Sequence, residues 1–377
     1  MPFNAVEVAR QIEESRPGAR LRDNERLNAL EHATRVYAQV DPQEWDRRVR
    51  SATLRRWAGV PISPLRALSE HRPSRPDYCV VATDSSFIPP DKHRGSYCHL
   101  INVGRVMIRY GDQPSAELDS IPRHSAEPLS DDDEAGAGRI LQAHCALQEL
   151  QHLYTLAHTY KADVALVDGS LMQLVLVLSK EPVVAQLMSE YFHTLAAFRD
   201  IGVPVVGYIS RPESEMVLRA LRMLECDQPV PCEKRPAQPC GCRPLWGVND
   251  ADLFGAVLTT EGHCSPLFEP VFSYLVGENV PGFKQLVFTY IATRYEVVRL
   301  ELPAWVWQED LLDRTLSIIL HQCLLGRGYP HSLMRAHEYA VLHGTDRERY
   351  HFMLERAGLM RSPTEKAHGK RVAGQSI

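Results

Sequence analysis

The sequence predicts an α/β fold, in which a mixed β-sheet is flanked by helices and carries a helical N-terminal region and a Cys/Pro-rich insertion. Between residues 78 and 224, short apolar runs typical of buried strands alternate with longer segments of helical periodicity. This strand–helix–strand–helix–strand order favours parallel neighbours in one sheet. With 377 residues, 44% of them hydrophobic, the chain is long enough to bury a large core.

Residues 1–71 are predicted to form the helical N-terminal region. Prolines interrupt the pattern after residue 60, and residues 71–76 are predicted to link this region to the next. The apolar residues that recur at helical spacing are Leu27, Leu30, Ala33, Val36 and Tyr37.

Residues 72–345 are predicted to form the main domain, followed by a charged tail over 346–377 whose end we expect to be mobile. Within this domain the polar stretch 112–134, which ends in four acidic residues, is predicted to be a solvated loop. The predicted elements are strands 78–83 and 98–110, helix 139–160, strand 162–167, helix 182–199, strand 203–209, helix 213–224, the insertion 226–246, hairpin strands 285–292 and 296–302, and helices 309–324 and 332–342.

The composition excludes few partners. The formal net charge of −5 does not indicate a nucleic-acid-binding protein, but affinity for phosphate depends on local patches. The N-terminal region holds one basic patch, for which a solvated helix face is the commoner explanation: Arg47, Arg48, Arg50, Arg55 and Arg56. No signal peptide or membrane-spanning stretch is evident, so we expect a cytoplasmic protein with reduced thiols.

Two predicted strands end on an aspartate that small residues follow, in Thr83-Asp84-Ser85-Ser86 and Val167-Asp168-Gly169-Ser170. In an open α/β sheet, ligands bind outside the carboxyl ends of the strands. Either aspartate alone fits ordinary turn chemistry. Two aspartates in matching positions of one sheet favour a functional site.

Glu149 supplies a third carboxylate. Its helical neighbours on one face are apolar, so we expect the carboxylate to be partly buried and to need a cation, or else a pair with Arg139 or Lys161. Strand Asp, helix Glu, strand Asp is similar to the acid set of the ribonuclease H superfamily. Three converging carboxylates repel one another unless divalent cations neutralise them, and Mg²⁺ or Mn²⁺ prefers such oxygen ligands.

The chain also resembles the NurA nucleases, which process DNA ends together with HerA-type ring translocases. The resemblance covers roughly residues 78–345 and is most specific in its last block. Its elements are Asp84-Ser85-Ser86, the helix with Glu149, Leu166-Val167-Asp168-Gly169-Ser170-Leu171, Asp252-Leu253-Phe254, Glu261 to Phe268, Val298 to Pro303, and Gly328-Tyr329-Pro330 followed by Ala336-His337-Glu338.

The resemblance implies a ribonuclease-H-like fold and a nuclease that uses two Mn²⁺ or Mg²⁺ ions. Activity as a 5′–3′ exonuclease and single-strand endonuclease, a homodimer and a HerA-type ATPase partner follow from it as expectations, in DNA repair or defence. Carried over residue by residue, it implies metal binding by Asp84, Glu149, Asp168 and His337, with Tyr329 completing the site. A surface histidine remains the alternative for His337.

Two positions depart from the family pattern. After the third strand the family often has a lysine, whereas this chain has Arg211, which can clamp a phosphate but cannot act as a general acid. Ser85 replaces a glycine and leaves the neighbouring carboxylate in place.

The insertion holds four cysteines among several prolines: Cys226, Cys232, Cys240 and Cys242. Four thiolates could hold zinc or an iron–sulfur cluster, but the irregular spacing also fits a proline-stiffened loop of thiols. Cys264 or His263 could substitute for one ligand.

No Walker A, G-x-S-x-G or H-E-x-x-H motif is present, so we expect no ATP hydrolysis by this chain. The competing interpretations are a catalytically inactive subunit that clamps DNA or docks on a translocase, and another ribonuclease-H-like enzyme. Trp305 and Trp307 could form a subunit contact or pack in the core.

Overall fold

The computed structural model describes residues 4–52, 57–64, 69–70, 77–129, 134–228, 232, 234–271 and 285–361. The chain divides into two compact units, each made of segments that are far apart in the sequence. Unit 1 draws on residues 1–72, 208–279 and 284–304, and unit 2 on 73–207, 280–283 and 305–377. The domain boundaries expected at residues 71 and 345 stay a prediction.

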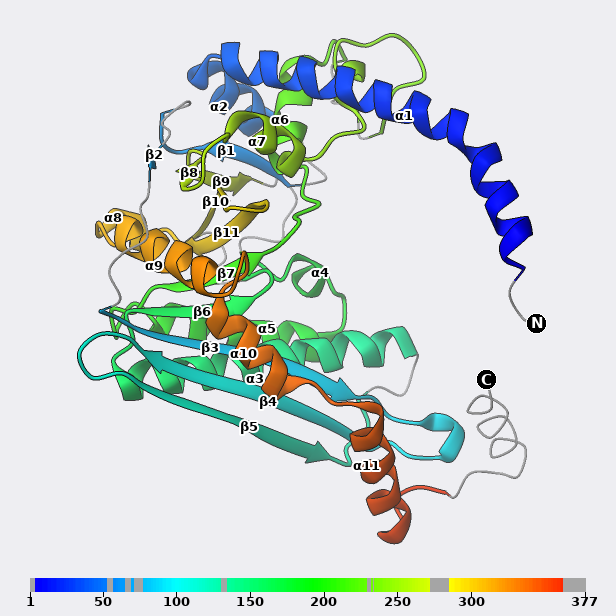
Figure 1. Ribbon diagram of the computed structural model, residues 1–377, viewed down its shortest axis with the longest axis vertical. Helices are drawn as coiled ribbons and strands as arrows, with labels where there is room; N and C mark the ends of the chain where they lie inside the picture. Colours follow the sequence, from blue (N-terminus) through cyan, green and yellow to red (C-terminus); the bar gives the residue numbers. More distant parts are fainter. Residues whose placement is uncertain are drawn as a thin grey trace. The chain divides into compact units, whose positions relative to one another are not determined.

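Unit 2 contains a mixed sheet in the order β7–β6–β3–β4–β5 (Figure 1). β3 and β6 are parallel, as predicted, whereas β3, β4 and β5 form an antiparallel meander. β7 crosses into unit 1 after Gly207. The strands are β3 (Cys79–Ile88), β4 (His99–Arg109), β5 (Ser115–Ser125), β6 (Val164–Asp168) and β7 (Val205–Ile209).

Helices cover both faces of this sheet. α3 packs on β3, β4 and α5, and α10 packs on β3 and β4 from the other side (Figure 1). The helices of unit 2 are η1 (Lys92–Arg94), α3 (Glu134–Tyr160), α4 (Leu174–Val177), α5 (Pro182–Ala197), α8 (Trp305–Gln308), α9 (Leu312–Leu325), α10 (His331–Ala340) and α11 (Gly344–Arg356).

Unit 1 combines the N-terminal helices with the predicted hairpin. β10 and β11 pair antiparallel from Leu286↔Pro303 to Ala292↔Val297, which confirms the hairpin. α2 begins where Asp41 accepts a hydrogen bond from the Gln43 amide, with Pro42 at its first turn. The elements are α1 (Ala5–Gln39), α2 (Pro42–Ser51), β1 (Ala58–Pro61), β2 (Ser69–Glu70), α6 (Met216–Leu224), η2 (Arg243–Leu245), α7 (Asp250–Val257), β8 (His263–Cys264), β9 (Phe268–Val271), β10 (Leu286–Ala292) and β11 (Val297–Pro303).

Three predictions about elements were wrong. β3 does not end on Asp84 but continues to Ile88, because β4 pairs with it along its whole length. Residues 115–125 of the predicted loop 112–134 instead form β5, a polar strand that pairs with β4 through its backbone. Part of the predicted tail is α11, while the acidic run 131–133 and residues 362–377 lie outside the described residues.

The structure bears on the alternatives that the sequence left open for the tryptophan pair and for the arginine patch. Trp305 is buried, and only Trp307, 38% exposed, remains available for a subunit contact. Among the patch arginines, Arg47 and Arg50 form ion pairs along α2, which fits a solvated helix face. Arg55 and Arg56 lie outside the described residues. No helix in the described part of the chain is long and apolar enough to cross a membrane.

Candidate active site

Asp84 and Asp168 lie side by side where the parallel pairing of β3 and β6 ends. The parallel register runs from Val80↔Val164 to Thr83↔Val167, so the next residue on each strand is an aspartate. Residues in register on neighbouring strands point to the same face of a sheet. Asp84 is only 16% exposed, whereas Asp168 lies at the surface. Partial desolvation raises the pKa of Asp168, and the negative charge of Asp84 raises it further.

His337 lies on the same face as Asp84. Its Nδ1 is 2.7 Å from Asp84 Oδ2, although the two residues are 253 positions apart in the chain. The imidazole is 62% exposed, so one nitrogen is fixed by the carboxylate while the rest of the ring faces solvent. An ionised carboxylate only accepts, so Nδ1–H is the donor.

Gly104 allows α10 to approach the sheet beside Asp84. It pairs with Asp84 across β3 and β4. A Cβ atom at Gly104 would lie 2.2 Å from the Ala336 carbonyl oxygen and 2.6 Å from the Ala340 nitrogen. The backbones of α10 and β4 therefore touch at this point, which only glycine permits. Asn102 Nδ2 donates to the carbonyl oxygens of Tyr339 (3.0 Å) and Ala340 (2.9 Å), which fastens the same helix.

Glu149 approaches from the opposite face of the sheet. Successive strand residues alternate between faces, so Ser85 faces α3 while Asp84 faces α10. The Ser85 hydroxyl donates to Glu149 Oε1, and Thr83 Oγ1 donates to the Glu149 carbonyl oxygen at 3.2 Å. Burial raises the pKa of Glu149 to about 8; the charges of Asp84 and Asp168 add to this rise and the Ser85 hydrogen bond opposes it.

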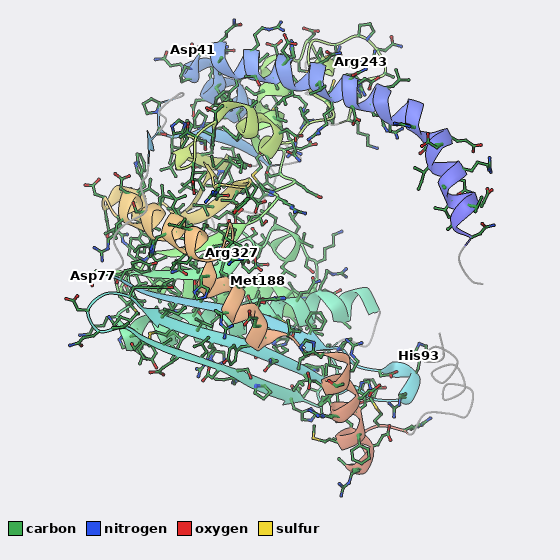
Figure 2. The ribbon with its side chains drawn as sticks, viewed as in Figure 1. Asp41, Asp77, His93, Met188, Arg243 and Arg327 are labelled. Carbon is green, nitrogen blue, oxygen red and sulfur yellow. The ribbon has the colours of Figure 1, made fainter. Side chains whose placement is uncertain are left out.

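Tyr329 reaches Asp168 from the loop between α9 and α10. Its hydroxyl is hydrogen-bonded to the Asp168 carboxylate, and burial raises the pKa of Tyr329 well above the usual range. The phenol therefore remains a neutral donor at physiological pH. The loop turns through positive φ at Arg327 (55°) and Gly328 (113°), and Arg327 marks it in Figure 2. Gln322 Oε1 accepts from the Ser332 amide at 2.9 Å and so fixes the start of α10.

Unit 2 thus holds five of the six predicted catalytic residues, and interactions connect them in one group: Asp84, Glu149, Asp168, Tyr329 and His337. The sixth, Arg211, belongs to unit 1. Its backbone has a positive φ of 45°, and its amide donates to Glu296 Oε2 at 3.0 Å. A role for the Arg211 side chain stays a prediction.

The donor set where β6 ends beside β3 fits hard divalent cations. Three carboxylates supply the oxygen ligands that Mg²⁺ and Mn²⁺ prefer, and their mutual repulsion is the kind that a cation relieves. Within the described residues, no three of these acid and histidine ligand atoms all lie within 4.8 Å of one another; only a cysteine group does. The acids are therefore spread more widely than ligands around a single ion. Such a spread is compatible with two ions, each held by a different subset.

The four insertion cysteines are the group that meets this distance criterion, and they belong to unit 1. Cys264 and His263, named as substitute ligands, are not part of it. None of the nine cysteines, all in the described part of the chain, forms a disulfide.

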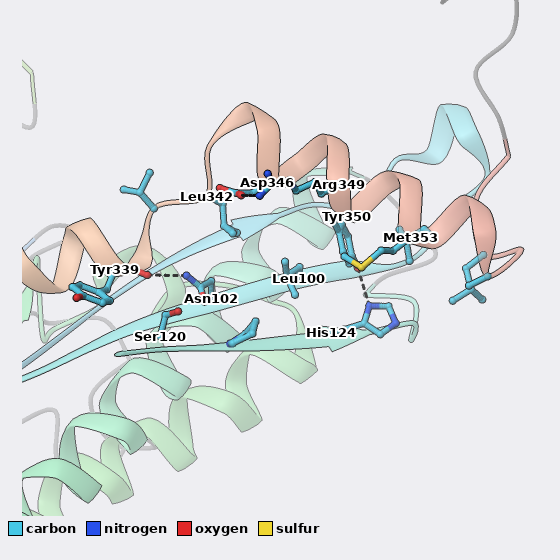
Figure 3. Close-up of a pocket in the computed structure, with 15 residues that line it drawn as sticks. Leu100, Asn102, Ser120, His124, Tyr339, Leu342, Asp346, Arg349, Tyr350 and Met353 are labelled. Atoms are coloured by element: carbon cyan, nitrogen blue, oxygen red, sulfur yellow. Dashed lines mark hydrogen bonds and ion pairs between the residues drawn. The ribbon is translucent and has the colours of Figure 1, made fainter. Parts of the chain in front are cut away.

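A separate cavity of about 650 Å³ lies between β4, β5 and the helices α10 and α11 (Figure 3). His124 Nδ1 and the Tyr350 hydroxyl lie 2.8 Å apart at its wall. None of the five acid-site residues lines it. The cavity is therefore distinct from the candidate active site.

Sequence reasoning missed the supports of this site. Gly104 stands inside a predicted strand, where glycine often marks a close backbone approach, and this signal could have been used. Asn102 carried no signal in the sequence. The sequence marks Ser85 only as a departure from the family pattern, whereas in the structure its hydroxyl donates to Glu149.

Glu149 should make the metal-free protein less stable as pH rises. Its pKa is about 8 in the folded protein against an ordinary 4.5, so the folded protein holds its proton over a range in which the unfolded chain has lost it. The free energy of unfolding then falls between about pH 4.5 and 8, by a few kcal/mol at most, since one pKa unit corresponds to about 1.4 kcal/mol. Glu149→Gln should flatten this slope in urea unfolding with EDTA.

The matched control is Glu190→Gln, an exposed glutamate of α5, which should follow the wild-type pH profile. An unchanged slope in Glu149→Gln would contradict the burial of an ionisable carboxylate at this position.

A family model described as the NurA domain matches residues 79–342. No curated protein gives a significant match to the chain.

Among solved structures, the chain is similar to the NurA nuclease from Sulfolobus solfataricus, with 14% identity and a TM-score of 0.47 over 77% of this chain and 86% of that one. It is also similar to the catalytic domain of human endonuclease V, with 14% identity and a TM-score of 0.32 over 78% and 92% of the two chains. For endonuclease V from Bacillus subtilis the identity is 12% and the TM-score 0.32, over 75% and 87%.

Proposed function

Because the chain belongs to the NurA family of nucleases, we propose that it is a divalent-metal-dependent deoxyribonuclease that hydrolyses phosphodiester bonds at DNA ends. The observation that carries the proposal is the proximity of Asp84, Asp168 and His337 where β6 ends beside β3, with Glu149 of α3 close to the same point from the other face of the sheet. We assign it 5′–3′ exonuclease and single-strand endonuclease activity.

Asp84, Glu149 and Asp168 would hold Mn²⁺ or Mg²⁺, and the bound ions supply an activated water and charge stabilisation for phosphodiester hydrolysis. His337 is oriented by Asp84 through Nδ1, which leaves Nε2 for a phosphate oxygen, a water or a metal ion. Tyr329 donates to Asp168 and Ser85 donates to Glu149, so each carboxylate keeps a fixed orientation. Arg211 is assigned the clamping of a DNA phosphate.

The test of this function is cleavage of linear DNA labelled at either end, in single- and double-stranded form, together with circular single-stranded DNA. Release of short products from the 5′ end and cutting of the circle would support the proposed activities. If folded protein binds DNA but cuts none of the substrates, the alternative of an inactive clamping or translocase-docking subunit replaces the proposal.

His337→Ala should lower the turnover number about 10- to 100-fold with a smaller change in DNA affinity. The exposed imidazole contacts Asp84 and contributes little to packing, so the fold should be unaffected. His331→Ala is a suitable control, because His331 also lies on α10 but does not contact the acids. Single-turnover cleavage and fluorescence anisotropy separate the two effects. Normal turnover would show that the histidine is merely structural.

We expect a homodimer in solution and stimulation of cleavage by the cognate HerA-type ATPase with ATP. The chain has no Walker A motif, so processive work on duplex DNA requires an external motor. Large apolar side chains are exposed along α1 and could dock on such a partner: Val6, Ile12, Leu21 and Leu27.

Two measurements test these expectations separately. Light scattering that shows a monomer at micromolar concentration would overturn the dimer. Failure of the folded ATPase ring to bind in a pull-down would overturn the partnership.

A further inference from the structure

The four insertion cysteines converge on one point in unit 1. All four Sγ atoms lie within 4.8 Å of one another. Cys226 Sγ is 3.8 Å from Cys232 Sγ and 3.8 Å from Cys240 Sγ, and the Cys232–Cys240 distance is 4.0 Å. Cys240 and Cys242 are 3.4 Å apart at sulfur. We propose that these residues form a tetrathiolate site for one structural Zn²⁺ ion.

The spacing of the sulfurs fits a single tetrahedral ion. Four sulfurs at a Zn–S distance of about 2.3 Å stand about 3.8 Å apart along each edge of the tetrahedron. A disulfide would require about 2.05 Å, whereas the shortest of the four distances above is 3.4 Å and all four cysteines are free thiols. The cysteine sulfurs of an iron–sulfur cluster are separated by its inorganic core and stand further apart, so the zinc assignment is favoured over the cluster.

The cysteine side chains themselves form the buried cluster of this segment. The buried cluster in this segment consists of Cys226, Cys240 and Cys242, with Cys232 packed against it, and no aliphatic or aromatic side chain belongs to it within the described residues. Small chain segments that lack an apolar core are commonly held by a metal or by disulfides. The thiol cluster therefore occupies the place of a hydrophobic core.

The backbone between Cys240 and Cys242 lies very close to the backbone that precedes Cys226. A Cβ atom at Gly241 would lie 2.3 Å from the Glu225 carbonyl oxygen, so glycine is required between Cys240 and Cys242. The Gly241 amide donates to Asp227 Oδ2 at 2.7 Å. The backbone amides of Cys242 and Asp227 donate to the Cys240 sulfur, an arrangement that stabilises a thiolate.

Neighbouring elements of unit 1 are anchored to this segment. Arg48 of α2 donates to the carbonyl oxygens of Met223 (3.3 Å) and Cys226 (3.1 Å). Arg235 pairs with Glu25 of α1 at 3.2 Å, and α1 also packs on η2, which follows Cys242 directly. Arg243 marks η2 in Figure 2. Metal binding, which replaces the four thiol protons, would thus hold α1 and α6 together.

Zinc binding at the four cysteines is independent of nuclease activity, so it can be tested without DNA. The full chain is purified anaerobically without added metal and its zinc and iron contents are measured by elemental analysis. The expected result is about one zinc per chain, with four sulfur ligands at about 2.3 Å in X-ray absorption at the zinc edge. Asp84→Asn should retain this zinc, because its substitution lies outside the thiol cluster.

Cys242→Ser should lose the zinc and melt several degrees lower. If Cys242→Ser does not fold, Cys232→Ser replaces it, since Cys232 is partly exposed. Cys98→Ala, a buried cysteine of another cluster, is the matched control and should keep the zinc. Zinc below about a tenth per chain in the wild-type protein, iron with inorganic sulfide in its place, or unchanged zinc in the folded serine variants would each overturn the proposal.

Discussion

Asp84→Asn and Asp168→Asn are each expected to abolish DNA cleavage while leaving the fold intact. Asparagine keeps the shape of the side chain but removes the charge that a divalent cation requires. Loss of an outer partner of a metal ligand typically costs 10–100-fold, so loss of a ligand itself should lower the cleavage rate by more than about 100-fold. The measurement is the initial rate on end-labelled DNA with Mn²⁺.

Asp119→Asn is the matched control for these variants. Asp119 lies on the edge strand β5 of the same sheet, and its carboxylate pairs with the partly buried Arg105 of β4 rather than with a residue of the acid site. It should cut at the wild-type rate. In EDTA, Asp168→Asn should melt at or above the wild-type temperature, because the pKa of Asp168 is raised by its surroundings in the folded protein. Full Mn²⁺-dependent activity in both acid variants would contradict the assignment of the site.

Gly104→Val is expected to destabilise the protein and to remove activity together. The added side chain would collide with backbone atoms of α10, which cannot yield as a flexible side chain can. We expect a loss of about 2–4 kcal/mol in the free energy of unfolding, because α10 must lift from β4 or the strand must shift. His337 would then leave Asp84, so the surviving folded protein should cut poorly.

Gly138→Ala provides the control for glycine replacement in the same unit. Gly138 lies in α3, and a Cβ atom there would meet nothing within 4 Å. Alanine in a helix should be neutral or stabilise by about 0.5–1 kcal/mol. Urea unfolding and cleavage rates of the two variants compare directly, and a fully stable, active Gly104→Val would disprove the close packing of α10 on the strand.

Hydrophobic patterning was sufficient to predict the interior elements. β6 and the hairpin β10–β11 are recognisable as short, nearly continuous apolar runs, because both faces of these strands are buried. α3 is recognisable because its apolar residues recur at helical spacing. The same reasoning failed for β5, whose side chains are mostly exposed, so its sequence carries no buried face. Its pairing with β4 depends on backbone hydrogen bonds, which no residue pattern reports.

The acids of the site could be located from sequence, but their partners could not. Asp84-Ser85-Ser86 has the composition of a turn, yet pairing with β4 keeps β3 extended through all three residues. The contact between His337 and Asp84 depends on α10 seating against Gly104, a tertiary fact that local propensity does not contain. Arg211 was placed by resemblance alone, and its side-chain role remains a prediction.

The most direct test of the central claim is incubation of the wild-type protein with end-labelled single- and double-stranded DNA in Mn²⁺, Mg²⁺ or EDTA, with Asp168→Asn run in parallel. The account predicts cleavage by the wild-type protein with Mn²⁺ or Mg²⁺, none in EDTA, and at most a trace from Asp168→Asn in any of the three. Equal cleavage in EDTA, or equal cleavage by Asp168→Asn, would contradict a metal-dependent nuclease built on these acids.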